Sequence, residues 1–291
     1  MADGPEIASP RDSPFQRLVA RWRRRAAEID PATGPDAHEL DPVALRQTLW
    51  GAGFVTPGGR EQVMTLAAPL RLGPGMALLD VAAGIGGAVR ALAERFRIEA
   101  HGLERDPELA RIGMAMSAAG RLARRAPVTV YDAEAFDLTP GRYDCVLARE
   151  ATHAVRDKER FLRVLMQGLK QGGALALTEF VLDRGAEDGG ALARWAETAP
   201  HPPKLWTLER YEDCLKSLGF APRAIADETS NYRALVLDAW TRFVERQELR
   251  RIPRAGFAPV VDEAERSLRL VQALESGALR LVRIHADANP R

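Results

Sequence analysis

The feature that most constrains the fold is an alternation of short apolar runs and helix-like segments between residues 76 and 181. Short, mostly apolar runs are typical of strands buried in a parallel sheet. Strands alternating with helices at this spacing predict a Rossmann-like, doubly wound, mainly parallel α/β sheet with right-handed crossovers. The expected strands are 76–81, 99–104, 128–132, 143–148 and 174–181, with helices at 86–96, 107–120 and 158–170, the last ended by Gly172 and Gly173.

The remaining sequence predicts a helical extension and a second set of helices around this sheet. We expect an N-terminal helical extension over 1–50, with a loose start, and one α/β domain over 51–291. Two further strands at 221–226 and 278–286 bring the expected sheet to seven. The expected helices are 15–30, 42–49, 60–70, 207–220, 229–249 and 260–276, with a linker at 31–42 and an irregular insertion at 183–206.

Composition narrows the choice of partners. The 41 basic and 40 acidic residues nearly cancel, so no global field favours nucleic acid or a membrane. We find no apolar run of the roughly 18–20 residues that span a bilayer, and no apolar signal core. Cys145 and Cys214 are far apart and lack metal spacing, which predicts a cytoplasmic location and no metal. A homodimer, and a membrane or phosphate contact of the basic helix around Trp22, are left open.

Charged side chains gather where the expected strands end. Ligands of such sheets bind beyond the carboxyl ends of the strands. The charged residues at these ends are Asp80, Glu104, Asp132, Arg149 and Glu150. Their coincidence predicts a ligand site at this edge of the sheet.

The segment Asp80–Gly87, the glycine loop, joins the first strand to its helix. Gly84 and Gly86 allow close approach of a ligand and present N–H groups at a helix N-terminus. The nicotinamide motif G-x-G-x-x-G would need glycine at position 82, which is Ala82, and no Lys-Ser/Thr pair follows to make a P-loop. The sequence therefore favours a nucleoside cofactor that is neither a nicotinamide dinucleotide nor a P-loop nucleotide.

Two acids complete the nucleoside pattern. Glu104, 24 residues after Asp80, is placed to accept both hydroxyls of a ribose. Asp132 can accept an adenine amino group, and the N–H of Ala133 can donate to a ring nitrogen.

This arrangement resembles the class I S-adenosylmethionine-dependent methyltransferase superfamily over residues 50–182. In that family the glycine loop backs the methionine part of the cofactor, with Gly common where Ala82 stands. The resemblance implies a cofactor site built from Thr56, Gly58, Asp80, Ala82, Gly84, Gly86, Glu104, Arg105, Asp132, Ala133 and Arg149.

Two stretches narrow the resemblance. GFVTPGG (residues 53–59, the GFVTPGG loop) resembles the loop that closes over the cofactor's amino acid end in phosphoethanolamine N-methyltransferases. LAREATHAV (147–155) resembles their segment after strand four, and also that of sterol C-methyltransferases; sarcosine-type enzymes are similar here too. The upstream region departs from the phosphobase enzymes, because it has Gln47 and Trp50 but no tyrosine. The spacing from Glu150 to His153 is also one residue shorter.

The resemblance implies that Arg149 faces the cofactor and that Glu150 and His153 face the acceptor. His153 would be the base, and Glu150 would orient it or stabilise a cation. We therefore expect methyl transfer to a small-molecule or lipid-precursor acceptor, by N-methylation of an amine. Residues 183–250, the N-terminal helix and the GFVTPGG loop are candidate covers.

Three alternatives stay open at this point. The first is C- or O-methylation of an isoprenoid, quinone, sterol-like or natural-product acceptor. The second is a nicotinamide-dependent oxidoreductase, although no Tyr-x-x-x-Lys pair is visible. The third is a non-catalytic relative that binds the cofactor.

Overall fold

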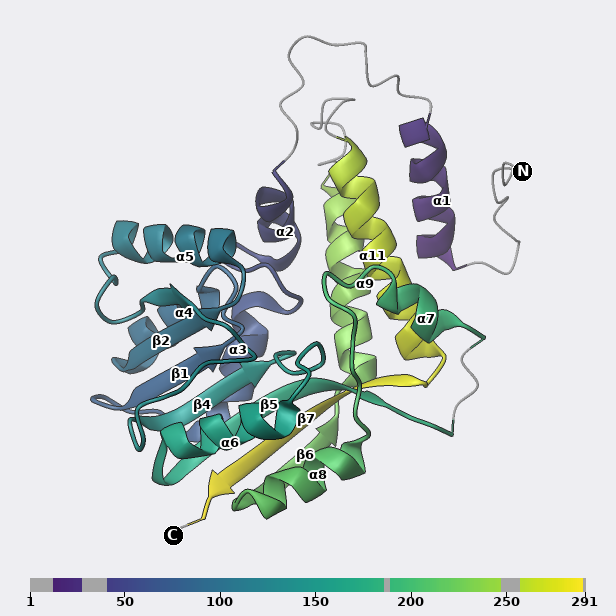
Figure 1. Cartoon of the computed structure of the whole chain (residues 1–291). Coiled ribbons are helices and arrows are strands. Elements are labelled where there is room, and N and C mark those ends of the chain that lie inside the picture. Colours follow the sequence, from purple (N-terminus) through teal and green to yellow (C-terminus); the bar gives the residue numbers. More distant parts are fainter. Residues whose placement is uncertain (1–12, 28–40, 186–188, 247–256, 290–291) are drawn as a thin grey trace.

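The computed structural model describes residues 13–27, 41–185, 189–246 and 257–289. In this part of the chain seven strands form one sheet in the order β3-β2-β1-β4-β5-β7-β6 (Figure 1). Neighbours are parallel except at β7, which is antiparallel to both β5 and β6. The predicted doubly wound, mainly parallel sheet is confirmed. Its strands are β1 Ala77–Val81, β2 Glu99–Glu104, β3 Val128–Val130, β4 Tyr143–Arg149, β5 Leu169–Leu182, β6 Phe220–Asp227 and β7 Leu279–Ala288.

Several helices begin where a side chain accepts from one of the first free N–H groups. Asp106 accepts from the N–H of Glu108 at 2.8 Å, and Asp157 accepts from that of Arg160 at 2.9 Å. The described helices are α1 Pro14–Ala27, α2 Pro42–Trp50, α3 Gly59–Ala67, α4 Gly87–Phe96, α5 Pro107–Ala119, α6 Lys158–Gly168, α7 Ala191–Ala196, α8 Leu208–Ser217, α9 Thr229–Glu245 and α11 Ala258–Glu275, with a 3₁₀ turn at Ala68–Leu70.

The sheet is buried on both faces. Successive strand residues point to opposite faces, so Leu78 joins one core and Leu79 the other. The first core lies under α3, α4, α9 and α11, and the second under α6 and α8. The central strands β1, β4 and β5 are therefore largely apolar, as the sequence pattern predicted, and their buried charged residues Asp80, Arg149 and Glu179 stand out.

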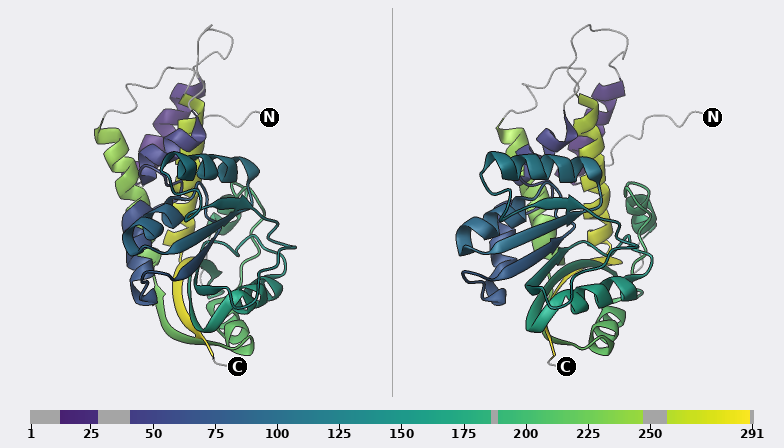
Figure 2. Two further views of the ribbon diagram at one scale, coloured as in Figure 1. Left: turned by 90° about the vertical axis from the view of Figure 1, so that its left-hand side faces the viewer. Right: turned by 60° about the vertical axis from the view of Figure 1, so that its left-hand side comes forward.

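The N-terminal helices extend the first core away from the sheet. Figures 1 and 2 show α1 beside α11, with α2 and α9 next to them. Aromatic rings join this layer: the Trp240 ring centroid lies 5.9 Å from that of Phe15 and 5.7 Å from that of Trp22. The helical extension thus shares one hydrophobic core with α9 and α11.

The predicted helix 158–170 was wrong at its end. α6 stops at Gly168, and β5 begins at Leu169 and includes both glycines. A Cβ at Gly173 would lie 3.0 Å from the carbonyl oxygen of Asp144, where the β4–β5 register shifts. Glycine here permits a close strand approach rather than ending a helix.

Other sequence predictions either differ from the structure or fall outside the described residues. The insertion at 183–206 was expected to be irregular, but it contains the short helix α7. Most of the loose start and of the 31–42 linker, and the last residues of two predicted helices, fall outside the described residues. Of the helices within the described ranges, none has the length and apolarity needed to cross a membrane.

Candidate cofactor and acceptor site

The GFVTPGG loop packs directly on the glycine loop. A Cβ at Gly87 would lie 2.2 Å from the carbonyl oxygen of Gly53, and one at Gly84 would lie 2.9 Å from Cγ2 of Val55. The cavity left between the two loops is about 10 Å³, close to the size of one water molecule. Glycine is needed at both positions for this contact.

The backbone of the glycine loop is left-handed at three positions. The φ angles are +63° at Ala82, +56° at Gly84 and +75° at Gly86. Glycine adopts this conformation freely, but alanine does so at a cost of roughly 1–2 kcal/mol. Ala82 therefore holds a strained backbone that glycine would adopt freely. Gly58, in the other loop, is also left-handed, at the N-terminus of α3.

Asp80 and Arg149 face each other across the strand ends. Asp80, in β1, is fully buried, and neither of its carboxylate oxygens has a hydrogen-bond partner. Its nearest ionic contact is Nη2 of Arg149, at 3.8 Å, and Arg149 also donates to Oγ1 of Thr56 at 3.4 Å. Burial raises the pKa of Asp80 to about 6, although Arg149 acts in the opposite direction. An unpaired buried carboxylate is costly, which indicates a place for a ligand donor.

Glu104, at the end of β2, is fixed by backbone N–H groups. Oε2 accepts from Gly84 at 2.7 Å, and Oε1 accepts from Asp106 at 2.9 Å. Burial raises the pKa of Glu104, and these hydrogen bonds act against the rise. Because an ionised carboxylate offers about four acceptor sites, both oxygens retain capacity for further donors.

The phenol of Tyr131 lies among the predicted cofactor acids. Burial raises its pKa most, and the charges of Glu104, Asp80 and Asp132 raise it further, while Arg105 opposes them. The Tyr131 phenol is thus within electrostatic reach of charges at the ends of β1, β2 and β3. Tyr131 was not predicted as a site residue from the sequence.

Asp132 and Ala133 follow β3. Oδ1 of Asp132 accepts from the N–H of Glu134 at 2.9 Å, and its side chain is exposed. Ala133 is buried below it. The loop thus leaves the carboxylate exposed, with Oδ1 fixed by the N–H of Glu134.

Glu150 takes a strained position directly after β4. Its φ angle is +46°, its N–H donates to the carbonyl of Thr178 at 2.7 Å, and its Oε1 accepts from the Thr178 hydroxyl at 2.8 Å. Burial raises the pKa of the carboxyl, partly offset by Arg149. A non-glycine residue held in this conformation is typical of functional sites.

His153 contacts a different carboxylate, Glu179. The distance from Nδ1 of His153 to Oε1 of Glu179 is 3.3 Å. Glu179 lies in β5 and is fully buried, and its Oε2 accepts from the N–H and hydroxyl of Thr152 at 2.6 and 2.7 Å. Tyr211 lies behind, with its hydroxyl 2.5 Å from that of Thr152. Burial opposes ionisation of Glu179, but these contacts outweigh it and keep its pKa below the usual range.

Aromatic rings stand beside His153. The Phe180 ring centroid lies 5.6 Å from that of His153, and Trp195 lies 5.5 Å from Phe180. Tyr232, from α9, packs edge-on against Phe180 at 5.8 Å. The charges of Glu150 and Arg149 also act on the Tyr232 phenol, which places the ring near both halves of the site.

Within the described ranges, no group of three or more His, Cys, Asp or Glu side chains is arranged to hold a metal ion. Glu179 and Glu150 are hydrogen-bonded to threonines, whereas both oxygens of Asp80, Nε of Arg149 and Nδ1 of His153 have no hydrogen-bond partner among the described residues. The arrangement suits a zwitterionic nucleoside at one end and a proton transfer at the other.

Comparison with protein families decides the class of this site. Residues 59–225 match the model of a family described as a methyltransferase domain. The chain belongs to that methyltransferase family. The match confirms the predicted class, an S-adenosylmethionine-dependent methyltransferase, over a segment that contains the glycine loop and His153.

Individual proteins are similar to this chain at low sequence identity. Phosphoethanolamine N-methyltransferase 2 of Caenorhabditis elegans is 23% identical over 209 residues, covering 71% of this chain and 45% of that protein. The chain thus spans less than half the length of this relative.

Solved structures share the fold. Haemonchus contortus phosphoethanolamine N-methyltransferase 2, in complex with phosphomonomethylethanolamine and S-adenosylhomocysteine, has a TM-score of 0.74 at 21% identity, over 86% of this chain and 57% of that one. A sarcosine dimethylglycine methyltransferase from Galdieria sulphuraria, described as putative, has a TM-score of 0.71 at 16% identity, over 85% of this chain and 97% of that one.

Proposed function

We propose that the protein transfers a methyl group from S-adenosylmethionine to an amine nitrogen of a small-molecule or lipid-precursor acceptor. The observation that carries this proposal is the contact of His153 with the buried, low-pKa carboxylate of Glu179. It supplies a base beside the aromatic rings of Phe180 and Trp195. This proposal includes the cytoplasmic location that the two free cysteines suggested.

The residues at the strand ends fit the cofactor. Asp80 has two unpaired oxygens and Arg149 has an unpaired Nε, which suits the ammonium and carboxylate groups of an amino acid. Glu104 keeps acceptor capacity for two ribose hydroxyls, and Asp132 and Ala133 would meet the adenine, with Arg105 at its edge. Thr56, Gly58, Ala82, Gly84 and Gly86 would surround the amino acid end. When bound, S-adenosylmethionine supplies an electrophilic methyl group on a sulfonium.

The acceptor side favours an amine. An ammonium group must lose a proton before its nitrogen can act as a nucleophile, and His153 is placed to take that proton. The Glu179 carboxylate would stabilise the resulting imidazolium and would orient Nδ1 toward itself, leaving Nε2 for the substrate. The methylated product is again a cation, which aromatic rings and carboxylates stabilise. Phe180, Trp195 and Glu150 provide them.

The two acids near His153, Glu179 and Glu150, differ in their contacts and therefore in their proposed roles. Glu179 makes the 3.3 Å contact with the imidazole, whereas Glu150 is hydrogen-bonded to Thr178. We propose that Glu179 positions the base and that Glu150 stabilises charge at the acceptor.

An acceptor panel with labelled methyl donor tests the proposal. The panel pairs amines with matched alcohols, and includes phosphoethanolamine, ethanolamine, sarcosine and ethylene glycol. We expect label on nitrogen, located by mass spectrometry, and a loss of about 10²–10⁴-fold in kcat for His153→Gln. Calorimetry should show unchanged cofactor affinity for this variant. Label on oxygen or carbon would reject N-methylation.

A further inference from the structure

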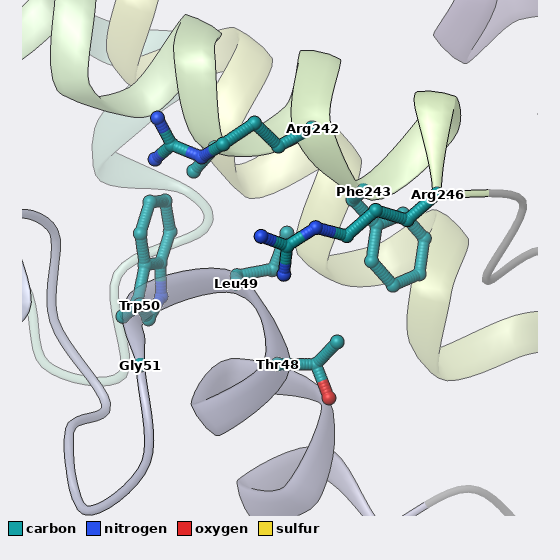
Figure 3. A pocket seen from close by; sticks show the side chains of 8 residues that line it. Thr48, Leu49, Trp50, Gly51, Arg242, Phe243 and Arg246 are labelled. Atoms are coloured by element: carbon teal, nitrogen blue, oxygen red, sulfur yellow. The ribbon is translucent and has the colours of Figure 1, made fainter.

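A hollow between the C-terminal end of α2 and the last turns of α9 is separate from the residues assigned above. Its volume is about 230 Å³. The apolar part of its lining is Leu49, Trp50 and Phe243, all buried, and the charged part is Arg242 and Arg246. Figure 3 shows both arginine side chains extending from α9 toward α2, where Leu49 and Trp50 lie.

The two arginines carry like charges close together. Arg242 lies in the last turn of α9 and Arg246 is its C-cap residue, four residues further on, so their charges repel. In the described part of the chain neither guanidinium has an acidic partner or a ring contact. Cations near the end of a helix are favoured by its dipole, but this does not explain why both reach across to α2.

The lining defines the chemistry of a ligand. A guanidinium matches the planar oxygens of a carboxylate or phosphate, and two of them suit one such group. The hydroxyl of Thr48 already donates to the carbonyl of Ala44 at 3.0 Å, so polar recognition falls on the arginines. The buried Leu49, Trp50 and Phe243 would receive an apolar body.

We propose that this hollow binds a small organic anion, with its carboxylate or phosphate on Arg242 and Arg246 and its apolar part against Trp50 and Phe243. The volume is below that of typical drug-sized ligand sites, which fits a compact ligand. The site does not depend on the acceptor chemistry proposed above. Its ligand is distinct from the methyl donor.

Calorimetry with the full chain tests this site, using benzoate and phenyl phosphate as anions and benzyl alcohol as the neutral probe. Titrations in about 0.15 M salt suppress diffuse attraction between exposed charges. We expect one anion to bind and benzyl alcohol not to bind. Arg242→Gln combined with Arg246→Gln should weaken anion binding at least about tenfold.

The matched control is Arg21→Gln combined with Arg24→Gln, which removes the same charge from exposed positions on α1. Equal binding by the two double variants, or no binding of either anion or of vesicles by the wild type, overturns the proposal. Vesicles of phosphatidic acid in phosphatidylcholine distinguish a lipid headgroup from a soluble ligand. Binding to vesicles alone, lost only in the α9 variant, supports the site and assigns the headgroup as its source. The melting temperatures of both variants check that they fold.

Discussion

The imidazole of His153 and the carboxylate of Glu179 meet at 3.3 Å, although they come from a loop after β4 and from the C-terminal part of β5. Thr152 and the N–H of Phe180 hold the carboxylate from other sides. The carboxylate of the pair therefore has a fixed orientation before any substrate arrives.

Replacing Glu179 with Gln should lower kcat by about 10²–10⁴-fold and leave cofactor affinity nearly unchanged. An amide removes the charge that stabilises the imidazolium while keeping the shape of the side chain. Initial rates at saturating methyl donor measure the effect. Glu159→Gln, at an exposed position on α6, is the control. A kcat within twofold of wild type would remove Glu179 from the mechanism.

Cofactor affinity should depend on pH through Asp80. Because its pKa is raised to about 6, the carboxylate is mostly protonated at pH 5 and mostly charged at pH 7. If the charged form pairs with the ammonium of S-adenosylmethionine, affinity at pH 5 should be about tenfold weaker than at pH 7. Calorimetry across this range measures it. Asp80→Asn should bind weakly with a flat profile, and the exposed Asp213→Asn should follow the wild type. A wild-type profile that is flat would contradict this role.

The same raised pKa predicts a stability effect of the opposite sign. Since the folded state holds a proton on Asp80 that the unfolded state releases near its ordinary pKa of 3.8, stability falls as pH rises from about 4 to 6. Without cofactor, Asp80→Asn should therefore be more stable than wild type at pH 7, by roughly 1–3 kcal/mol. Urea unfolding at pH 4 and pH 7 checks this, and the difference between the two proteins should shrink at pH 4. Equal stabilities at pH 7 would show that the buried charge costs little.

Ala82→Gly should stabilise the chain by about 0.5–1 kcal/mol, because glycine relieves the left-handed backbone at φ +63°. The control is Ala83→Gly, one residue further on. Ala83 is buried and is not among the residues with positive φ, so its loss should destabilise. Thermal unfolding distinguishes the two, and a destabilised Ala82→Gly would mean that the methyl group packs well enough to outweigh the strain.

Much of the fold could be predicted, because a parallel sheet buried on both faces leaves continuous apolar runs such as ALALTEFV. The strand ends then placed Asp80, Glu104 and Asp132 at one edge. The α6–β5 boundary could not be predicted, because two consecutive glycines such as Gly172 and Gly173 can either end a helix or allow two strands to approach closely.

The acceptor side was less accessible to sequence reasoning. Glu179 is a single acid inside an apolar run, and this was its available signal. Its partner depends on the path of the loop that carries Thr152 and His153. Sequence spacing pointed instead to Glu150, because it is near His153 along the chain.

The tight seating of the GFVTPGG loop on the glycine loop has a kinetic consequence. A gap of this size cannot hold the amino acid end of the methyl donor, so we expect the GFVTPGG loop to move away from the glycine loop when the donor binds. If this movement limits release of the demethylated product, solvent viscosity should slow steady-state turnover and spare the first round of chemistry.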